Sequence, residues 1–397
     1  MKFEVVCSEL QRLGQNVLRG YKRNDSSLVA FKVEDNKFKL VCYSPTTYFQ
    51  GEIPAMNVED SDNEWKSLDG QNFKQILSVF YSNNENIKFT SDKIVQNFVL
   101  RHQKNRVTLK TVLGDLIQEE NEFEEIVEVD ALSFVDILGK MSGLRETHNT
   151  NSFLSNLELV FKNNNIIFIG TDSYVLGETT MPVEEIKIDN TFYHIRGEEV
   201  SVLTKSVEPN EIWTLIKTDT KIGFKDQHGL IGLVGIADNA RHIPAELQKD
   251  KIVKETESDF NRIGVNSVSF KKALNNISKI SSPNDPSVTL SFGKNGLTVM
   301  NISGDVFDVE TNYSEDKRIS VSFVRESLQK IIPLLTDEFN FVLKDDPVSQ
   351  ASQIELLKVV KGKDDEEDTL EIDNSTFLIV MSNNNLDVQN IEEILEN

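Results

Sequence analysis

The chain has 397 residues, with 42 basic and 64 acidic side chains and a formal net charge of -22 at pH 7. This length exceeds one ordinary domain of about 100 to 200 residues. Hydrophobic residues make up 39% of the chain, with only 19 Gly and 9 Pro, which excludes wholesale disorder and a fibrous repeat. The acidic average charge also argues against indiscriminate adhesion to nucleic acid or anionic membranes. We expect a globular, multidomain protein.

Cysteine usage and the N-terminal segment indicate the compartment. Cys7 and Cys42 are too few for a disulfide framework, and neither stands in a CxxC motif or a Cys/His cluster. The apolar stretch near the N-terminus is short and is interrupted by Glu4, so it lacks the long apolar core of a signal peptide. No window approaches the roughly 20 uninterrupted apolar residues of a membrane-spanning helix. The sequence therefore predicts a cytoplasmic protein without a membrane partner.

An order of elements recurs three times along the chain: an amphipathic helix, several short alternating strands, a second helix and further strands. Most strand connections are too short for crossovers, so the strands are expected to be mainly antiparallel. We predict an α+β fold of three similar domains at 1–122, 123–254 and 255–382. A solvated acidic loop is expected over 361–373 and an acidic tail over 383–397. Helices are expected at 6–23, 68–83, 129–145, 196–207, 265–281 and 323–336.

The charge is distributed unevenly between the predicted helices and the rest of the chain. The helices carry 14 basic and 7 acidic residues, a net +7, which leaves -29 on all other residues. In the fifth helix an apolar stripe containing Phe270 and Leu274 places Lys271 and Lys272 on the opposite face, with no acid between them. Lysines on an outer helix face often only solubilise it. Cationic helix faces in an acidic chain nevertheless favour loose, sequence-independent contact with phosphates.

The segment 156–182 carries a family resemblance. It leads from a strand into TDSYVLG at Thr171–Gly177, and it resembles the bacterial sliding clamp, the beta subunit of DNA polymerase III, where the element is TD-x-[HY]-R-L-A. The MKF start, the strand RVTLKTV, the segment ARHIP and the closing strand STFLIVM fall in the family's order. The resemblance extends to about Ser382. The divergent motifs and the acidic, cysteine-poor composition suggest a bacteriophage or distant bacterial member of the family.

The resemblance implies a ring that holds DNA. Three similar domains in each of two subunits would close the ring, with helices lining the hole and sheets forming the outer wall. The protein would encircle double-stranded DNA without sequence preference and would tether the replicative DNA polymerase. It would be a non-catalytic processivity factor without a cofactor, placed on DNA by a clamp loader. The candidate phosphate contacts are Arg12, Arg19, Lys22, Arg23, Lys74, Lys140, Arg145, Arg196, Lys205, Lys271, Lys272, Lys279, Arg325 and Lys330.

Two protein-binding surfaces also follow from the resemblance. A head-to-tail homodimer would use Val107 and Leu109 of one subunit and Ile277 and Ile280 of the other, although all four could instead be core residues. A second surface, an apolar pocket for short peptides of the polymerase and loader, would have an altered preference because Val175 replaces the family's usual Arg. The matching pocket positions are Leu154, Thr171, Ser173, Tyr174, Val175, Leu176, Arg241, His242, Ile379 and Met381.

Two alternatives to a clamp remain open: an acidic α+β hydrolase with a carboxylate site, and a β-rich structural or scaffold protein with accidental cationic faces. No GxSxG, HExxH, P-loop or GxGxxG motif stands in a suitable strand and helix context. Asp172 could serve as a general acid, or it could cap the turn that follows its strand. The acidic segment 361–373 lacks the EF-hand order. We therefore expect neither a catalytic residue nor a metal ligand.

Overall fold

The protein forms two compact units. The first comprises 1–136, 183–189 and 198–238, and the second comprises 137–182, 190–197 and 239–397. The computed structural model describes all residues except 23–26, 62, 81–83, 92–96, 113–119, 121, 148–152, 205–210, 238–240, 244, 246–259, 283–284, 314–317, 345–350, 361–368 and 382–397.

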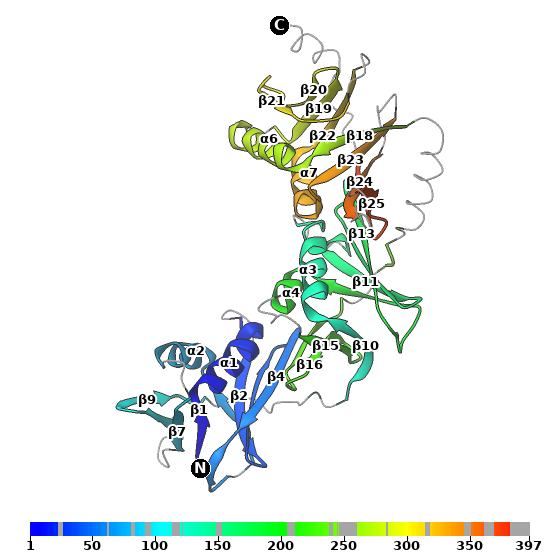
Figure 1. Cartoon of the computed structure of the whole chain (residues 1–397). Helices are drawn as coiled ribbons and strands as arrows, with labels where there is room; N and C mark the ends of the chain where they lie inside the picture. Colours follow the sequence, from blue (N-terminus) through cyan, green and yellow to red (C-terminus); the bar gives the residue numbers. More distant parts are fainter. Residues whose placement is uncertain are drawn as a thin grey trace. The chain divides into compact units, whose positions relative to one another are not determined.

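The structure confirms the six predicted helices (Figure 1). In α1, Leu10, Leu13 and Val17 are buried, so this helix faces the core with an apolar stripe, as expected of an amphipathic helix. The last helix ends before Pro333, which lies in a short 3-10 turn, because proline lacks the N–H that a helix interior needs. The helices of the described residues are α1 (Cys7–Val17), α2 (Gly70–Val79), α3 (Ala131–Ser142), α4 (Gly197–Leu203), α6 (Ser267–Ile280) and α7 (Arg325–Ile331), with 3-10 turns η1 (Leu18–Gly20), η2 (Phe153–Ser155) and η3 (Ile332–Leu334).

The first unit contains two antiparallel sheets. One has the strand order β5-β1-β7-β8-β9 and the other β10-β15-β16-β17-β4-β3-β2-β6. The second sheet joins distant parts of the chain where β4 pairs with β17, and Tyr48 and Leu233 are buried at this join. The strands are β1 (Lys2–Val6), β2 (Leu28–Glu34), β3 (Lys37–Tyr43), β4 (Thr47–Pro54), β5 (Met56–Glu59), β6 (Lys66–Leu68), β7 (Asn86–Ser91), β8 (Phe98–His102), β9 (Asn105–Leu109), β10 (Glu124–Asp130), β15 (Ile212–Lys217), β16 (Lys221–Asp226) and β17 (Ile231–Gly235).

The second unit repeats this arrangement. Its larger sheet has the order β14-β11-β12-β13-β26-β24-β23-β18, with β25 paired to β24, and its smaller sheet has the order β21-β20-β19-β22. The larger sheet is again joined by strands far apart in sequence, because β13 pairs with β26. The strands are β11 (Asn156–Lys162), β12 (Asn165–Thr171), β13 (Val175–Pro182), β14 (Thr191–Arg196), β18 (Phe260–Asn266), β19 (Ser287–Gly293), β20 (Gly296–Met300), β21 (Val306–Val309), β22 (Ile319–Val324), β23 (Glu338–Lys344), β24 (Ala351–Val360), β25 (Thr369–Ile372) and β26 (Thr376–Met381).

The predicted α+β class and its recurring element order are confirmed. A strand, a helix, several strands, a second helix and further strands follow one another from β1, from β10 and from β18. The division into three domains stays a prediction, since the two compact units share the predicted middle domain, 123–254.

The prediction of a loop throughout 361–373 is wrong for its last part. Thr369–Ile372 forms β25, which pairs antiparallel with β24 from Val360 to Leu357. Thr369 and Ile372 are strand-favouring residues, and β25 forms at the edge of the sheet although all four of its side chains are exposed. The remaining loop residues 361–368 and the predicted tail 383–397 lie outside the described residues.

None of the described helices is long and apolar enough to cross a membrane. Among the residues that the structure describes, no group of three or more His, Cys, Asp or Glu side chains is placed to hold a metal ion.

Both cysteines are expected to be unreactive in the folded protein. Cys7 and Cys42 are free and buried, and burial raises the pKa of the Cys42 thiol to about 12. Only the thiolate is nucleophilic, so iodoacetamide at pH 8 should leave Cys42 unmodified in the native state and should alkylate both cysteines in denaturant. Mass spectrometry of the labelled protein measures this, and rapid native labelling of Cys42 would contradict the observed packing.

Candidate functional site

A tight turn joins β12 to β13 in the second unit. The Asp172 carboxylate accepts hydrogen bonds at Oδ1 from the N–H groups of Tyr174 and Val175, at 2.9 and 2.8 Å. The Thr171 hydroxyl donates to the carbonyl of Val175 at 2.7 Å. Ser173 has a φ of 78°, in the left-handed region. Asp172 therefore caps the turn. Of the two roles considered from the sequence, a general acid and a turn cap, the contacts match the turn cap.

An apolar surface extends from this turn onto β26. The N–H of Met381 donates to the carbonyl of Tyr174 at 2.7 Å, and Leu176 lies opposite Ile379 in the β13–β26 pair. Leu176 packs against two buried clusters, one containing Ile379 and the other containing Ile243. Tyr174 is 51% exposed and Met381 40% exposed. The surface thus combines a fixed apolar base with two accessible side chains.

A buried carboxylate anchors the segment that flanks this surface. Glu158, on β11, is 0% exposed. It accepts a hydrogen bond from the N–H of Ile243 at 2.7 Å and pairs with the Nδ1 of His242. The Nε2 of His194 lies 3.0 Å from Glu158, although without hydrogen-bond geometry. A buried carboxylate is stable only with such partners, so these contacts fix the segment against the sheet.

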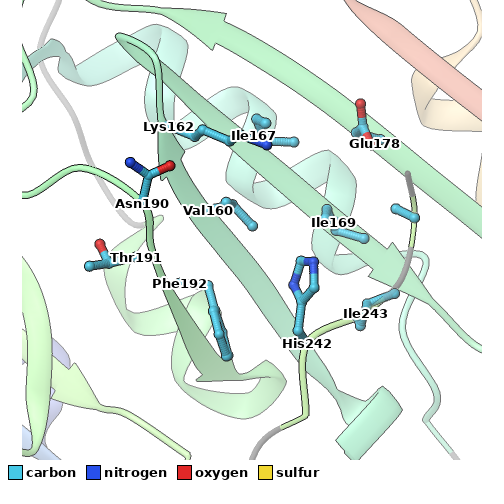
Figure 2. A pocket seen from close by; sticks show the side chains of 11 residues that line it. Val160, Lys162, Ile167, Ile169, Glu178, Asn190, Thr191, Phe192, His242 and Ile243 are labelled. Carbon is cyan, nitrogen blue, oxygen red and sulfur yellow. The ribbon is translucent and has the colours of Figure 1, made fainter. Parts of the chain in front are cut away.

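A cavity of about 250 Å³ lies between this segment and the sheet (Figure 2). Its base is apolar, and the ring of Phe192, 42% exposed, faces the His242 ring at a centroid distance of 5.3 Å. A small apolar cavity with a few polar groups at its rim is a typical place for a ligand side chain. The lining residues are Val160, Lys162, Ile167, Ile169, Glu178, Asn190, Thr191, Phe192, His242, Ile243 and Ala245.

The structure brings most of the predicted pocket residues together. The end of β12, the turn and the start of β13 carry five of them, and β26 carries Ile379 and Met381. Leu154 lies in η2 and is half-buried, while Arg241 is exposed. Val175 is only 1% exposed, so its side chain lies in the core beneath the surface. Sequence reasoning missed Glu158, whose one signal is a lone acid within an otherwise apolar strand.

The predicted phosphate contacts differ widely in accessibility. Lys22 is held by Glu199 of α4, a 0% exposed acid 3.1 Å away. Lys330 is held by Asp172 at 2.6 Å. Arg23 and Lys205 lie outside the described residues. The exposed cations are Arg12, Lys74, Lys272 and Lys279. The half-buried cations are Arg19, Lys22, Lys140, Arg145, Arg196, Lys271, Arg325 and Lys330.

Acidic side chains accompany two of these arginines. Arg12 and Arg19 line a cavity of about 210 Å³ in the first unit together with Glu211 and Asp226. Burial lowers the pKa of Arg19, and the two acids partly offset this effect. The Arg19 guanidinium also donates to Asn16 at 2.6 Å. The mixed charge of this cavity weakens its attraction for phosphate.

Replacing Asp226 with Asn is expected to stabilise the protein at neutral pH. Burial raises the pKa of Asp226 above the ordinary value of about 3.9. The ionised carboxylate therefore lowers the free energy of unfolding, and this loss develops as the pH rises through the folded-state pKa. Asn keeps the oxygen that accepts from the N–H groups of His228 and Leu230, both at 2.8 Å. Urea unfolding should show a gain below about 1 kcal/mol at pH 7 that vanishes at pH 4. A loss of stability at pH 7 would contradict this account.

The four predicted dimer residues divide into two pairs. Leu109 and Ile277 are 0% exposed, so these two are core residues, which was the alternative to a dimer contact. Val107, on β9, is half-buried, and Ile280, at the end of α6, is 51% exposed. Only Val107 and Ile280 therefore offer accessible side-chain surface to a second copy.

Comparison with known proteins gives a clear result for the fold. No protein-family model and no curated protein sequence matches the chain. Solved structures do match: the DNA polymerase III subunit beta from Pseudomonas aeruginosa is 14% identical, with a TM-score of 0.77 over 96% of this chain and 100% of that chain. The Bacillus subtilis DNA polymerase sliding clamp is 14% identical, with a TM-score of 0.76 over 96% and 99%. The Helicobacter pylori beta clamp bound to a DNA ligase peptide is 14% identical, with a TM-score of 0.70 over 96% and 100%. The chain has the fold of bacterial DNA sliding clamps, which confirms the predicted fold.

Proposed function

We propose that the protein is a DNA sliding clamp, a non-catalytic, ring-shaped processivity factor that encircles duplex DNA and tethers the replicative polymerase. The observation that carries this proposal is the sliding-clamp fold, which covers 96% of the chain. Neither a hydrolase site nor a scaffold role explains this fold together with cationic helix faces. The protein acts in the cytoplasm, that of the host cell if a bacteriophage encodes it.

The ends of the sheets support a closed ring. Within the units, β4 pairs with β17 and β13 pairs with β26, so each large sheet continues across distant parts of the chain. Among the described strands, β9 and β21 each end a smaller sheet without a further neighbour. Unpaired edges promote association, and head-to-tail pairing of β9 with β21 of a second copy would continue the sheets from subunit to subunit. Two copies, each with domains 1–122, 123–254 and 255–382, then form the ring.

The apolar surface around Leu176 is the partner site in this proposal. The Helicobacter pylori clamp was solved with a DNA ligase peptide. In this chain, Tyr174, Leu176 and Met381 offer apolar contacts to peptides of the polymerase and the clamp loader, and Ile379 packs beneath Leu176. Val175 stands where the family usually has Arg and is buried, so this position offers the peptide no charged side chain.

The charge distribution suits enclosure of DNA. The exposed cations Arg12, Lys74, Lys272 and Lys279 lie on or beside α1, α2 and α6, the helices that line the hole in the proposed ring. Contacts of this kind bind phosphate oxygens without reading bases, so they permit sliding. The net charge of -22 repels DNA from the rest of the surface.

Retention on circular DNA tests the proposed function. The protein is loaded onto nicked circular plasmid with a bacterial clamp loader and ATP, and half of the sample is then linearised. A clamp elutes with the circular DNA in gel filtration at moderate salt and is lost from the linear DNA through its free ends. Equal retention or equal loss on both DNAs would contradict topological binding.

A further inference from the structure

The lysine of α7 that was expected to face DNA is instead bonded to the turn of the partner site. We propose that Lys330 is a positioning residue of the peptide site, which acts through Asp172 to fix the turn that carries Tyr174. This inference rests on the proposed function, since the site is the one assigned there to partner peptides. It removes Lys330 from the set of phosphate contacts.

The pair is close and shielded from solvent. The Nζ of Lys330 lies 2.6 Å from the Oδ2 of Asp172, and the two side chains are 11% and 6% exposed. The same ammonium donates to the carbonyl of Arg145 at 3.2 Å. Glu326, on the same helix, is farther away at 3.7 Å and is 49% exposed. When one partner of such a buried pair is removed, the other is left as an uncompensated buried charge, which is strongly destabilising. Lys330 and Asp172 therefore stabilise each other.

Asp172, which Lys330 holds at Oδ2, in turn holds the turn with its other carboxylate oxygen. The Oδ1 atom accepts from the N–H groups of Tyr174 and Val175. Between them and Asp172, Ser173 adopts a φ of 78°, which a residue with a side chain adopts at a cost. The surrounding contacts must therefore hold this conformation in place.

The restraint continues to the accessible part of the site. The carbonyl of Tyr174 accepts from the N–H of Met381 at 2.7 Å, which connects the turn to the end of β26. Tyr174 and Met381 are the two exposed apolar side chains of the site. A series of bonds thus runs from α7, through Lys330 and Asp172, to the groups that a peptide would contact. Because Asp172 neutralises Lys330, this lysine contributes little attraction for DNA.

One single variant and one double variant test the role of Lys330. Lys330→Met leaves Asp172 buried without its cation, and the double variant with Asp172→Asn removes both charges but keeps the Oδ1 acceptor. Lys358→Met is the matched control, because Lys358 is an exposed lysine of the same unit outside the site. The fluorescently labelled DNA ligase peptide of the Helicobacter pylori complex serves as the probe. Hydrogen exchange of 171–176 reports the turn itself, without any ligand.

Lys330→Met is expected to raise the peptide Kd at least about tenfold and to speed exchange of the Tyr174 and Val175 amides by a similar factor. The double variant should recover most of the wild-type peptide affinity and most of the slow amide exchange. Lys358→Met should change neither the affinity nor the exchange. Unchanged exchange in Lys330→Met, or an equal loss in the double variant, would overturn the proposal. If the wild-type protein does not bind the peptide, the proposed partner site fails for this probe, while the exchange measurement still decides the role of Lys330.

Discussion

Replacing Ile280 with Glu is expected to convert the protein from a dimer of twice 45.0 kDa to a 45.0 kDa monomer. Ile280 is 51% exposed at the end of α6, so the substitution leaves the core of the subunit intact. In the proposed ring its side chain is buried against the β9 edge of a second copy. A carboxylate left without a partner there costs several kcal/mol, which weakens the dimer by about a hundredfold or more. Light scattering across a dilution series measures the change.

Val268→Glu is the matched control for this variant. Val268 lies on the same helix, is 68% exposed and lies outside the predicted dimer contact. It should keep the dimer, whereas Val107→Glu on β9 should disrupt it from the opposite side. Ile280→Glu should also abolish retention on circular DNA. The melting temperature of this monomeric variant should equal that of the wild-type protein diluted until it is monomeric. A dimer that survives both the Ile280 and Val107 substitutions would refute head-to-tail closure through these elements.

Local patterns predicted the helices well because each helix buries one stripe of its own residues. Phe270, Ala273, Leu274 and Ile277 of α6 are buried as their spacing requires. The same argument could not place β25, because a four-residue strand whose side chains are all exposed buries no apolar face. Its pairing depends on β24, and no local signal encodes that partner.

The accuracy of the site prediction was limited because accessibility depends on contacts between residues far apart in sequence. Lys22 and Lys330 have the charge and helical position expected of phosphate contacts, yet each is paired with an acid more than 150 positions away. Leu109 and Ile277 have the apolar character of interface residues and lie in the core. Residue type is therefore a good indicator of chemistry, whereas accessibility depends on tertiary packing that spacing alone does not determine.

The cavity beside His242 illustrates the same limit. Its lining comes from β11, β12, β13, β14, Asn190 and the residues His242, Ile243 and Ala245, and Glu158 of β11 accepts a hydrogen bond from the N–H of Ile243. Of the predicted pocket residues, only His242 also lines this cavity.

Replacing Leu176 with Glu is expected to abolish peptide binding at the proposed partner site. Leu176 contacts both buried clusters beneath the site, so a carboxylate there would lie against Ile379 on one side and Ile243 on the other. The unfavourable burial should raise the Kd for the Helicobacter pylori ligase peptide at least about a hundredfold. Because Leu176 is partly exposed, the loss of folding stability should stay near 1–2 kcal/mol. Fluorescence anisotropy and urea unfolding measure the two effects.

Leu176→Ala and Leu370→Glu separate loss of the site from loss of the fold. The alanine variant removes apolar contact area without adding charge, so a smaller loss of about tenfold is expected. Leu370, 55% exposed on β25, receives the same acidic substitution away from the site and should bind the peptide as the wild type does. Both Leu176 variants should still form dimers, because ring closure uses β9 and α6. If Leu176→Glu binds the peptide normally, partner peptides must bind elsewhere, and the cavity beside His242 becomes the surface to test.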